Sequence, residues 1–217
     1  MPVNKSDAFS FYSHLAGAIA ATAGYGILLY CSWGSLPVVI VSSIYSLSTI
    51  FLFVSSTVYH GLKTDENTTS KLRKLDHIAI FFMIAGTYTP LCYIYLDGYM
   101  RWGIIAAQWL LVILGFWLKI FYVQAPRALT VAIYVLMGWM ALIPLKQLVD
   151  IMSPHSLVLL VAGGVAYTVG GIVYTVKKPD PRPGVFGFHD IFHLWILLGA
   201  VLHYLVVYGA VLTATAV

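Results

Sequence analysis

The stretch that decides the fold is FGFHDIFHLW (residues 186–195), with the run LWILLGAVLHYLVVYGAVLTATAV (residues 194–217) that continues it. Two histidines, His189 and His193, stand four residues apart at the start of a segment that is otherwise almost entirely apolar. A run of this length meets the requirement of roughly 20 apolar residues for a helix that crosses a bilayer. The stretch therefore predicts a membrane-spanning helix with a histidine pair near one end.

The composition of the whole chain favours lipid as its main solvent. Of the 217 residues, 60% are hydrophobic and only 9% are charged, and the mean hydropathy is +0.88. Soluble domains carry about 25% charged residues, so a soluble fold is excluded. The twelve Lys and Arg residues are too few and too scattered to form a nucleic-acid-binding face, and no nucleic-acid partner is expected.

Seven apolar runs of spanning length follow one another along the chain. We expect helices at about 8–33, 37–61, 72–96, 102–122, 128–148, 156–176 and 188–213. Residues 1–7 are short and polar and do not resemble a cleavable signal, so the first run is expected to remain as a helix. The predicted fold class is an all-α membrane protein, a single seven-transmembrane helix bundle over residues 1–217, located as a multi-pass protein in the plasma or inner membrane.

The longer connections contain no domain linker. The segment KKPDPRPG (residues 177–184) holds three prolines and cannot be helical throughout. Pro90 and Pro144 fall near predicted helix ends and are expected only to shape them. Ala162, Ala166 and Gly170 lie four residues apart, which indicates either a close-packed helix face or the ordinary abundance of small residues in membrane helices.

The two cysteines, Cys31 and Cys92, lie near the ends of apolar runs and lack metal-like spacing. We interpret them as small buried residues. A disulfide between them stays open as an alternative if the two ends meet on an oxidising side of the membrane.

The positive charges predict the orientation of the bundle. Arg101 and Lys146 fall on one side of the predicted membrane. The other ten fall on the opposite side: Lys5, Lys63, Lys71, Arg73, Lys74, Lys119, Arg127, Lys177, Lys178 and Arg182. Since Lys and Arg are enriched in cytoplasmic connections, the amino terminus is predicted to be cytoplasmic. An odd number of spans then places the carboxyl terminus outside.

Four ionisable residues from three predicted helices share one depth near the cytoplasmic face. His60 lies near the inner end of the second span, Asp76 near the inner start of the third, and His189 and His193 near that of the seventh. Ionisable groups are costly in a membrane, so this coincidence indicates a functional site. Asp76 has an alternative explanation as the partner of a nearby cation, Arg73.

The spacing of the histidines is typical of a metal site. At positions i and i+4, His189 and His193 point the same way and can bind one ion, with His60 as the third ligand. Three protein ligands and a water form the pattern of catalytic zinc sites, in which the pKa of the water falls to about 7. Asp76 would hold or deprotonate this water, and Ser56, one turn before His60, would hydrogen-bond to it.

Other polar residues near these spans have less distinct roles. Asp190 is expected to serve the outer shell of the site or solvent, because it lies about 100° round the helix from His189. His14, His77 and His203 are interpreted as interfacial polar groups. In an alternative, they line a transport path, because His203 lies roughly 15 Å deeper than His193.

Three motifs in order along the chain resemble those of the hemolysin III family, the bacterial and archaeal branch of the progestin and adipoQ receptor superfamily. They are SSTVYHG (55–61), LRKLDHIAIFFMIAGTYTP (72–90) and FHDIFHLWILLGAVLHY (188–204). The resemblance implies seven transmembrane helices with a cytoplasmic amino terminus. It also implies a zinc ion on His60, His189 and His193, with Ser56 and Asp76 close to the metal-bound water. Relatives often carry Glu where this chain has Asp190.

The function expected from these observations is the zinc-dependent hydrolysis of a lipid amide or ester, because the superfamily that the chain resembles includes alkaline ceramidases. A membrane lipid would be the substrate. Two alternatives stay open: a non-enzymatic receptor, sensor or hemolysin-like protein with a structural zinc, and a transporter or channel.

Overall fold

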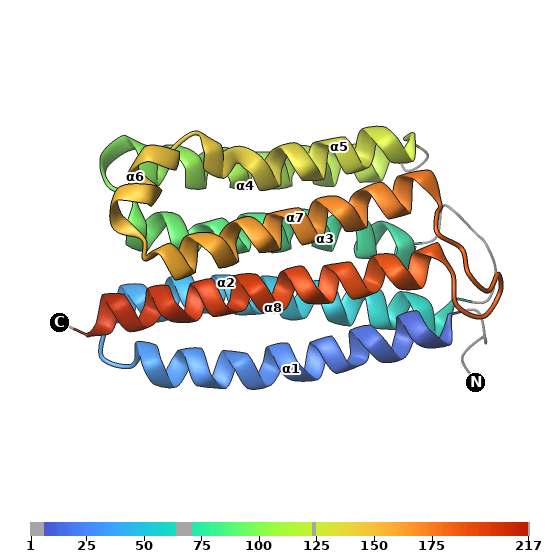
Figure 1. The fold of residues 1–217 in the computed structure, drawn as a ribbon, viewed down its shortest axis with the longest axis horizontal. Helices are drawn as coiled ribbons and strands as arrows, with labels where there is room; N and C mark the ends of the chain where they lie inside the picture. Colours follow the sequence, from blue (N-terminus) through green and yellow to red (C-terminus); the bar gives the residue numbers. More distant parts are fainter. Residues whose placement is uncertain (1–6, 64–70, 123–124, 217) are drawn as a thin grey trace.

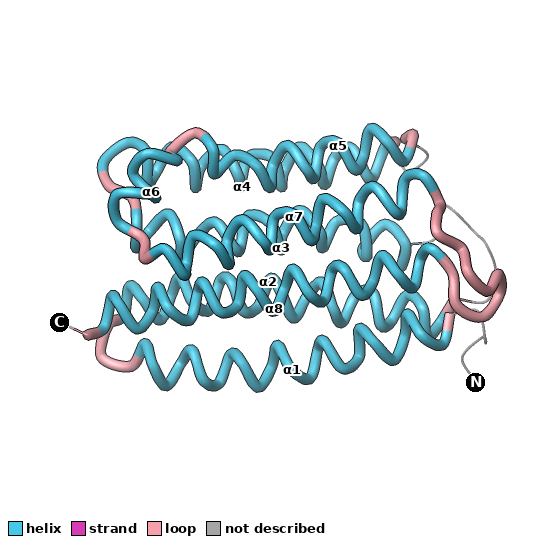
Figure 2. Tube along the Cα trace, in the orientation of Figure 1, coloured by secondary structure: helices cyan, strands magenta, loops and turns pink. Residues whose placement is uncertain are grey.

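The protein is a bundle of long helices that run side by side along its longest axis (Figures 1 and 2). The computed structural model describes residues 7–63, 71–122 and 125–216. The helices are α1 (Ala8–Ser32), α2 (Leu36–Leu62), α3 (Lys71–Tyr95), α4 (Gly98–Phe121), α5 (Arg127–Gly138), η1 (Trp139–Leu142), α6 (Leu145–Ile151), α7 (Pro154–Val176) and α8 (Phe188–Thr215). Within the described ranges no strand is formed, and residues 177–187 are non-helical, as the prolines predict.

The described residues form six to seven candidate membrane spans. Six helices (α1 to α4, α7 and α8) are long and apolar enough to cross a membrane by themselves, and the bent segment of α5, η1 and α6 makes a seventh if it is counted as one span. The expected all-helical membrane fold is therefore confirmed. The chain begins at one end of the bundle and finishes at the other (Figure 1), and we call these the N-terminal end and the C-terminal end.

The prediction of one continuous fifth helix over residues 128–148 is wrong. The chain tightens into the 3₁₀ helix η1, breaks at Pro144 and turns by 54° into α6. Proline lacks a backbone N–H and its ring clashes with the preceding turn, so a helix is readily broken there. Pro90, by contrast, lies inside α3, which continues to Tyr95.

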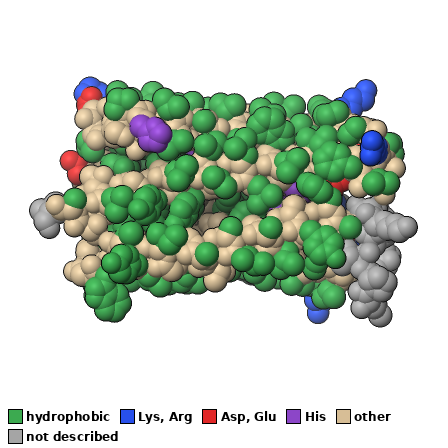
Figure 3. Space-filling view, turned by 60° about the horizontal axis from the view of Figure 1, so that its bottom comes forward, with side chains coloured by type: hydrophobic (Ala, Val, Ile, Leu, Met, Phe, Trp, Pro, Cys, Tyr) green, Lys and Arg blue, Asp and Glu red, His purple; other side chains and the backbone are tan. Residues whose placement is uncertain are grey.

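The surface of the bundle matches a lipid environment. Large apolar side chains face outward along its length, among them Ile40, Leu114 and Val201, each more than half exposed. Figure 3 shows hydrophobic side chains over the middle of one face and charged side chains gathered toward its two ends. Such a belt is what the hydrocarbon core of a bilayer requires, since charges are costly there.

The interior is built where α2, α3 and α8 are covered by their neighbours. Small residues allow the closest approaches: a Cβ added at Gly86 of α3 would lie 2.5 Å from the Cβ of Ser48 of α2. On α7, Gly163, Ala166 and Gly170 are buried, whereas Ala162 is only half-buried. The small-residue face thus exists, with Gly163 in the place expected for Ala162.

The two cysteines are unpaired in the structure. Cys92 is buried in an apolar cluster near the C-terminal end, and Cys31 packs against the same cluster. Both therefore behave as the small apolar residues that the sequence predicts.

The helix ends separate the positive charges as expected. The described members of the predicted cytoplasmic group lie at or near helix ends and loops of the N-terminal end, and Arg101 and Lys146 belong to the C-terminal end. Lys5 lies outside the described residues. The direction in which the bundle crosses the membrane stays a prediction.

Candidate metal centre

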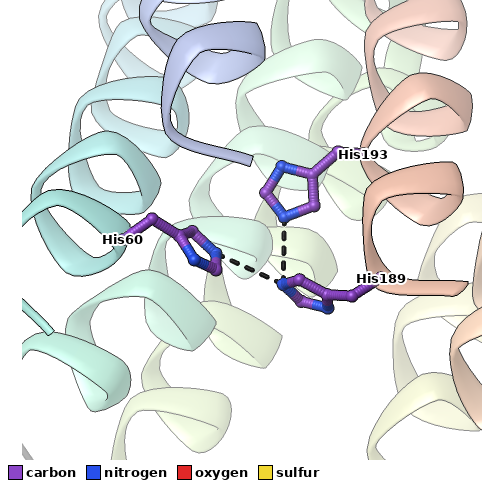
Figure 4. Close-up of side chains that lie close together, drawn as sticks. All are labelled: His60, His189 and His193. Carbon is purple, nitrogen blue, oxygen red and sulfur yellow. Dashed lines mark hydrogen bonds between the residues drawn. The ribbon is translucent and has the colours of Figure 1, made fainter. Parts of the chain in front are cut away.

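Three imidazole rings meet between α2 and α8 near the N-terminal end (Figure 4). The Nε2 atom of His189 lies 3.2 Å from Nε2 of His60 and 3.1 Å from Nε2 of His193. One nitrogen from each ring lies within 4.8 Å of the other two. His60 and His193 are buried and His189 is half-buried, so the three nitrogens converge largely out of contact with water.

This convergence resembles a shared ligand set in two of its three nitrogen separations. For an ion with three imidazole nitrogens at about 2.0–2.1 Å, tetrahedral angles separate the nitrogens by roughly 3.3 Å. The two observed separations of 3.1 and 3.2 Å are close to that value. The Nε2 atom of a neutral imidazole either donates or accepts a hydrogen bond. Three Nε2 atoms that converge on one point therefore cannot all be paired by hydrogen bonds to one another. The three residues could therefore hold a metal ion.

Helix α1 supports the first of these rings. Asp7, the residue just before α1, accepts a hydrogen bond from Nδ1 of His60 at 2.9 Å, and its carboxylate also lies 3.4 Å from Nζ of Lys63. Burial by itself would raise the pKa of Asp7. The hydrogen bond from His60 and the charge of Lys63 outweigh it, so the pKa of this carboxyl lies below its usual value. An ionised partner on Nδ1 directs the lone pair of His60 Nε2 toward its neighbours.

Two further residues of α1 reach the same region. The Ser10 hydroxyl donates to Asp190 at 2.9 Å, and the other carboxylate oxygen of Asp190 accepts from the backbone N–H of Gly187. Asp190 is therefore buried and ties α1 to the first turn of α8, rather than facing solvent. The ring of His14 lies against that of His193, with centroids 3.8 Å apart, and neither of its buried nitrogens has a partner among the described residues.

The residues with predicted chemical roles lie on the wall of a neighbouring cavity of about 150 Å³. Ser56 and Asp76 both line it, together with His189 and His193. Ser56 is buried and close enough to Asp76 to share a hydrogen bond with it. The structure thus brings the five predicted site residues to one end of the bundle, with His60 next to His189.

The cavity extends from the three histidines toward the middle of the bundle. His14, His77 and His203, interpreted from sequence as interfacial, all line it. His203 donates from Nε2 to the backbone oxygen of Leu160 at 3.1 Å. All three therefore face the interior of the bundle, with His14 buried and His77 and His203 half-buried. Their role in a transport path stays a prediction.

Sequence reasoning missed the contribution of α1. Asp7, Ser10 and His14 follow the spacing i, i+3 and i+7, which places them on one face of a helix. This polar face in an otherwise apolar first span was the available signal. The role of this polar face could not be predicted from the first span alone, because its partners lie on α2 and α8.

Known proteins resemble this chain over most of its length. A model of the family described as "Haemolysin-III related" matches residues 4–204. "Hemolysin-3" of Bacillus cereus is 32% identical over 198 residues, which cover 90% of this chain and 87% of that protein. "Hemolysin-3 homolog" of Bacillus subtilis is 32% identical over 203 residues, 88% of this chain and 91% of that protein.

More distant relatives extend the comparison to animals. "Monocyte to macrophage differentiation factor" of Homo sapiens is 27% identical over 218 residues, 94% of this chain and 83% of that protein. "Adiponectin receptor protein" of Drosophila melanogaster is 27% identical over 90% of this chain and 48% of that protein. With its helical membrane bundle, its histidine centre and these matches, the chain belongs to the haemolysin-III related family, within the progestin and adipoQ receptor superfamily.

Proposed function

We propose that this protein is a zinc-dependent hydrolase that cleaves an amide or ester bond of a membrane lipid. One observation carries the proposal: the three imidazole nitrogens converge beside a cavity whose wall also holds a carboxyl group and a hydroxyl group, Asp76 and Ser56. A ligand set, a base and a hydrogen-bonding group at one point are the parts that hydrolysis requires.

Zinc is the ion that this set of ligands fits best. Three neutral imidazoles suit zinc, and three protein ligands are typical of catalytic zinc sites, whereas structural sites usually have four. His60, His189 and His193 would hold the ion, with Asp7 as the carboxylate behind His60. When bound, zinc supplies Lewis acidity, which polarises a carbonyl group and makes a nearby water easier to deprotonate.

The protein side chains account for the remaining chemistry. Asp76 accepts the proton of the attacking water and returns it to the leaving group, as a general acid and base. Ser56, which lies on the same cavity wall as Asp76, orients the carboxyl group. The apolar cavity wall, which includes Met83, Ile84 and Ile196, holds the acyl chain of the lipid and excludes bulk water.

A second function is favoured by the way the site joins the bundle. The histidine centre ties α2 to α8, and Asp7 adds the start of α1, so an ion bound there would also stabilise the fold. The names of relatives include a receptor and hemolysins. A non-enzymatic receptor, sensor or hemolysin-like protein with a structural zinc is therefore the competing proposal.

Metal analysis of the purified protein, together with the activity of the Asp76→Asn variant, distinguishes the hydrolase proposal from the structural-zinc proposal. The hydrolase proposal expects about one zinc per chain, lost in a His189→Ala/His193→Ala variant. Asp76→Asn should keep the metal and lose turnover of a short-chain lipid amide or ester by at least about 100-fold. Absence of turnover by the zinc-loaded parent protein would contradict a hydrolase, and full turnover in Asp76→Asn would exclude Asp76 as the acid and base. A lack of zinc in the parent protein would contradict both proposals.

A further inference from the structure

A group of positive side chains lies at the N-terminal end of the bundle, on helices other than those that carry the three histidines. Lys119 comes from the last turn of α4 and Arg127 from the start of α5. Together with Arg73, both lie within electrostatic range of His77, whose side chain lines the cavity. Cations from three helices therefore act on one side chain of the cavity wall.

Lys119 does not behave as an ordinary lysine at a membrane surface. Such side chains extend toward headgroups and water, as the exposed Lys177 and Lys178 do at the same end. Lys119 is only 2% exposed, and its ammonium group turns inward to donate to the hydroxyl of Thr130 at 2.9 Å. Among the described residues, no carboxylate forms an ion pair with it.

Arg127 is also left without an acidic partner in the described part of the chain. Its guanidinium carbon lies 5.1 Å from the ring centroid of Tyr174, and its Nη1 atom is buried with no hydrogen-bond partner. The ring of Tyr174 contacts His189, with centroids 5.8 Å apart. The guanidinium group is therefore separated from the histidine centre by a single aromatic ring.

Thr130 supplies a third donor. Other threonines of the bundle, such as Thr57, Thr87 and Thr168, donate their hydroxyl proton to the carbonyl four residues earlier. No such bond is formed by Thr130 within the described residues, and its oxygen accepts from Lys119. Its hydroxyl proton is free for a ligand, and Thr130 lines the cavity.

Ammonium, guanidinium and hydroxyl donors without a matching acid form a site for an anion. Unpaired buried cations are costly, and a guanidinium fork fits phosphate oxygens well. From this arrangement we infer that Lys119, Arg127 and Thr130 bind the phosphate group of an acyl phospholipid whose chain occupies the cavity. The bound lipid would be the substrate class of the hydrolase, a part of the inference that rests on the proposed function.

Lipid binding can be measured without turnover. A fluorescent phosphatidic acid is titrated into the full-length protein in neutral detergent, with diacylglycerol and inorganic phosphate as competitors. Phosphatidic acid should bind, diacylglycerol should compete weakly, and low millimolar inorganic phosphate should leave the lipid bound. Arg127→Gln and Lys119→Met should each weaken binding by about tenfold or more, because each removes a charge-assisted hydrogen bond.

Matched controls distinguish a site from general surface charge. Lys178→Gln removes an exposed charge at the same end and should leave the affinity unchanged. Thr130→Val keeps the charges and the side-chain shape and should weaken binding less than Arg127→Gln. The melting temperature of each variant is measured first, to confirm that it folds. If Lys119→Met does not fold, Arg127→Gln tests the inference by itself, because Arg127 is partly exposed.

Several results would overturn the inference. One is that Lys178→Gln weakens lipid binding as much as Arg127→Gln or Lys119→Met does. Another is that diacylglycerol competes as well as phosphatidic acid. A third is that low millimolar inorganic phosphate displaces the lipid, which would indicate a site for the free ion. The metal-free His189→Ala/His193→Ala variant separates this inference from the proposed function. Phosphatidic acid should still bind to it, so a failure of hydrolysis leaves the binding result intact.

Discussion

Asp7 shows how one side chain can change its role through its neighbours. An Asp just before a helix usually caps it by accepting from a backbone N–H of the first turn. Asp7 makes no such bond, and its carboxylate instead accepts from His60 and faces Lys63. A local reading of the sequence therefore assigns Asp7 to the tail, whereas the fold makes it the support of a candidate ligand.

Removal of this carboxylate should weaken metal binding. Asp7→Ala should lower zinc affinity by about 10- to 100-fold, the usual effect of losing the partner of a metal-binding histidine. The zinc affinity of Asp7→Asn should lie between those of Asp7→Ala and the parent protein, since the amide oxygen of Asn can still accept a hydrogen bond from Nδ1 of His60. Affinity is measured by competition with a chelator. Asp150→Asn, at the C-terminal end, is the control and should bind like the parent; equal affinity in Asp7→Ala would rule out the supporting role.

Metal retention should depend on pH in a defined direction. The ligands must be neutral to bind an ion, so protons compete with the metal as the pH falls. Zinc affinity should therefore fall as the pH is lowered from about 7.5 to about 4. It should recover on return to the higher pH. His155→Ala removes an exposed histidine elsewhere and should keep the same profile. A profile that is flat over this range would exclude the three-histidine ligand set.

At the scale of the helices, a small residue allows α7 to pack closely against α8. Gly163 of α7 packs against the ring of His203 of α8, and a Cβ added there would collide with this ring. His203 is held in place by its hydrogen bond to Leu160 and cannot move away easily. The glycine is therefore required by packing, not by backbone conformation.

Gly163→Ala should accordingly destabilise the bundle. Overpacking of this kind costs about 1–3 kcal/mol, which corresponds to a fall of several degrees in the melting temperature. Gly103→Ala on α4 is the matched control, because a Cβ there meets nothing within 4 Å. Its melting temperature should be unchanged or slightly higher, since Ala favours helices more than Gly. Similar melting temperatures for both variants would contradict the close packing of α7 on α8.

The two prolines illustrate the limit of sequence reasoning about elements. Pro144 breaks the fifth span, and Pro90 is accommodated inside α3. Both were expected only to shape helix ends. The residue type is the same, so the outcome depends on how neighbouring helices satisfy the backbone groups that a proline leaves free.

At the scale of the whole molecule, the separation of charge between the two ends predicts the orientation in the membrane. In a Cys31→Ser/Cys92→Ser background, His155→Cys should react with an impermeant maleimide in intact cells. Lys178→Cys, at the other end, should react only after permeabilisation. Both parent residues are exposed, so accessibility is matched. The reverse pattern would show that the amino terminus is outside.

The sequence by itself determined the all-helical membrane class, the succession of apolar helices of spanning length and the placement of His60, Asp76, His189 and His193 near one end of their helices. These properties are local: a span is recognised by its length of apolar residues, and depth follows from the rise along a helix. They required no knowledge of which helices are neighbours.

Only the tertiary structure decided which groups meet. The rotation of each helix about its axis, set by packing against its neighbours, turned Asp7 and His14 toward the histidine centre and placed Lys119 against Thr130. It also enclosed a cavity that reaches His203. Such contacts join residues far apart in the chain, and no local pattern of hydrophobicity or charge specifies them, because they depend on the fit between whole helix faces.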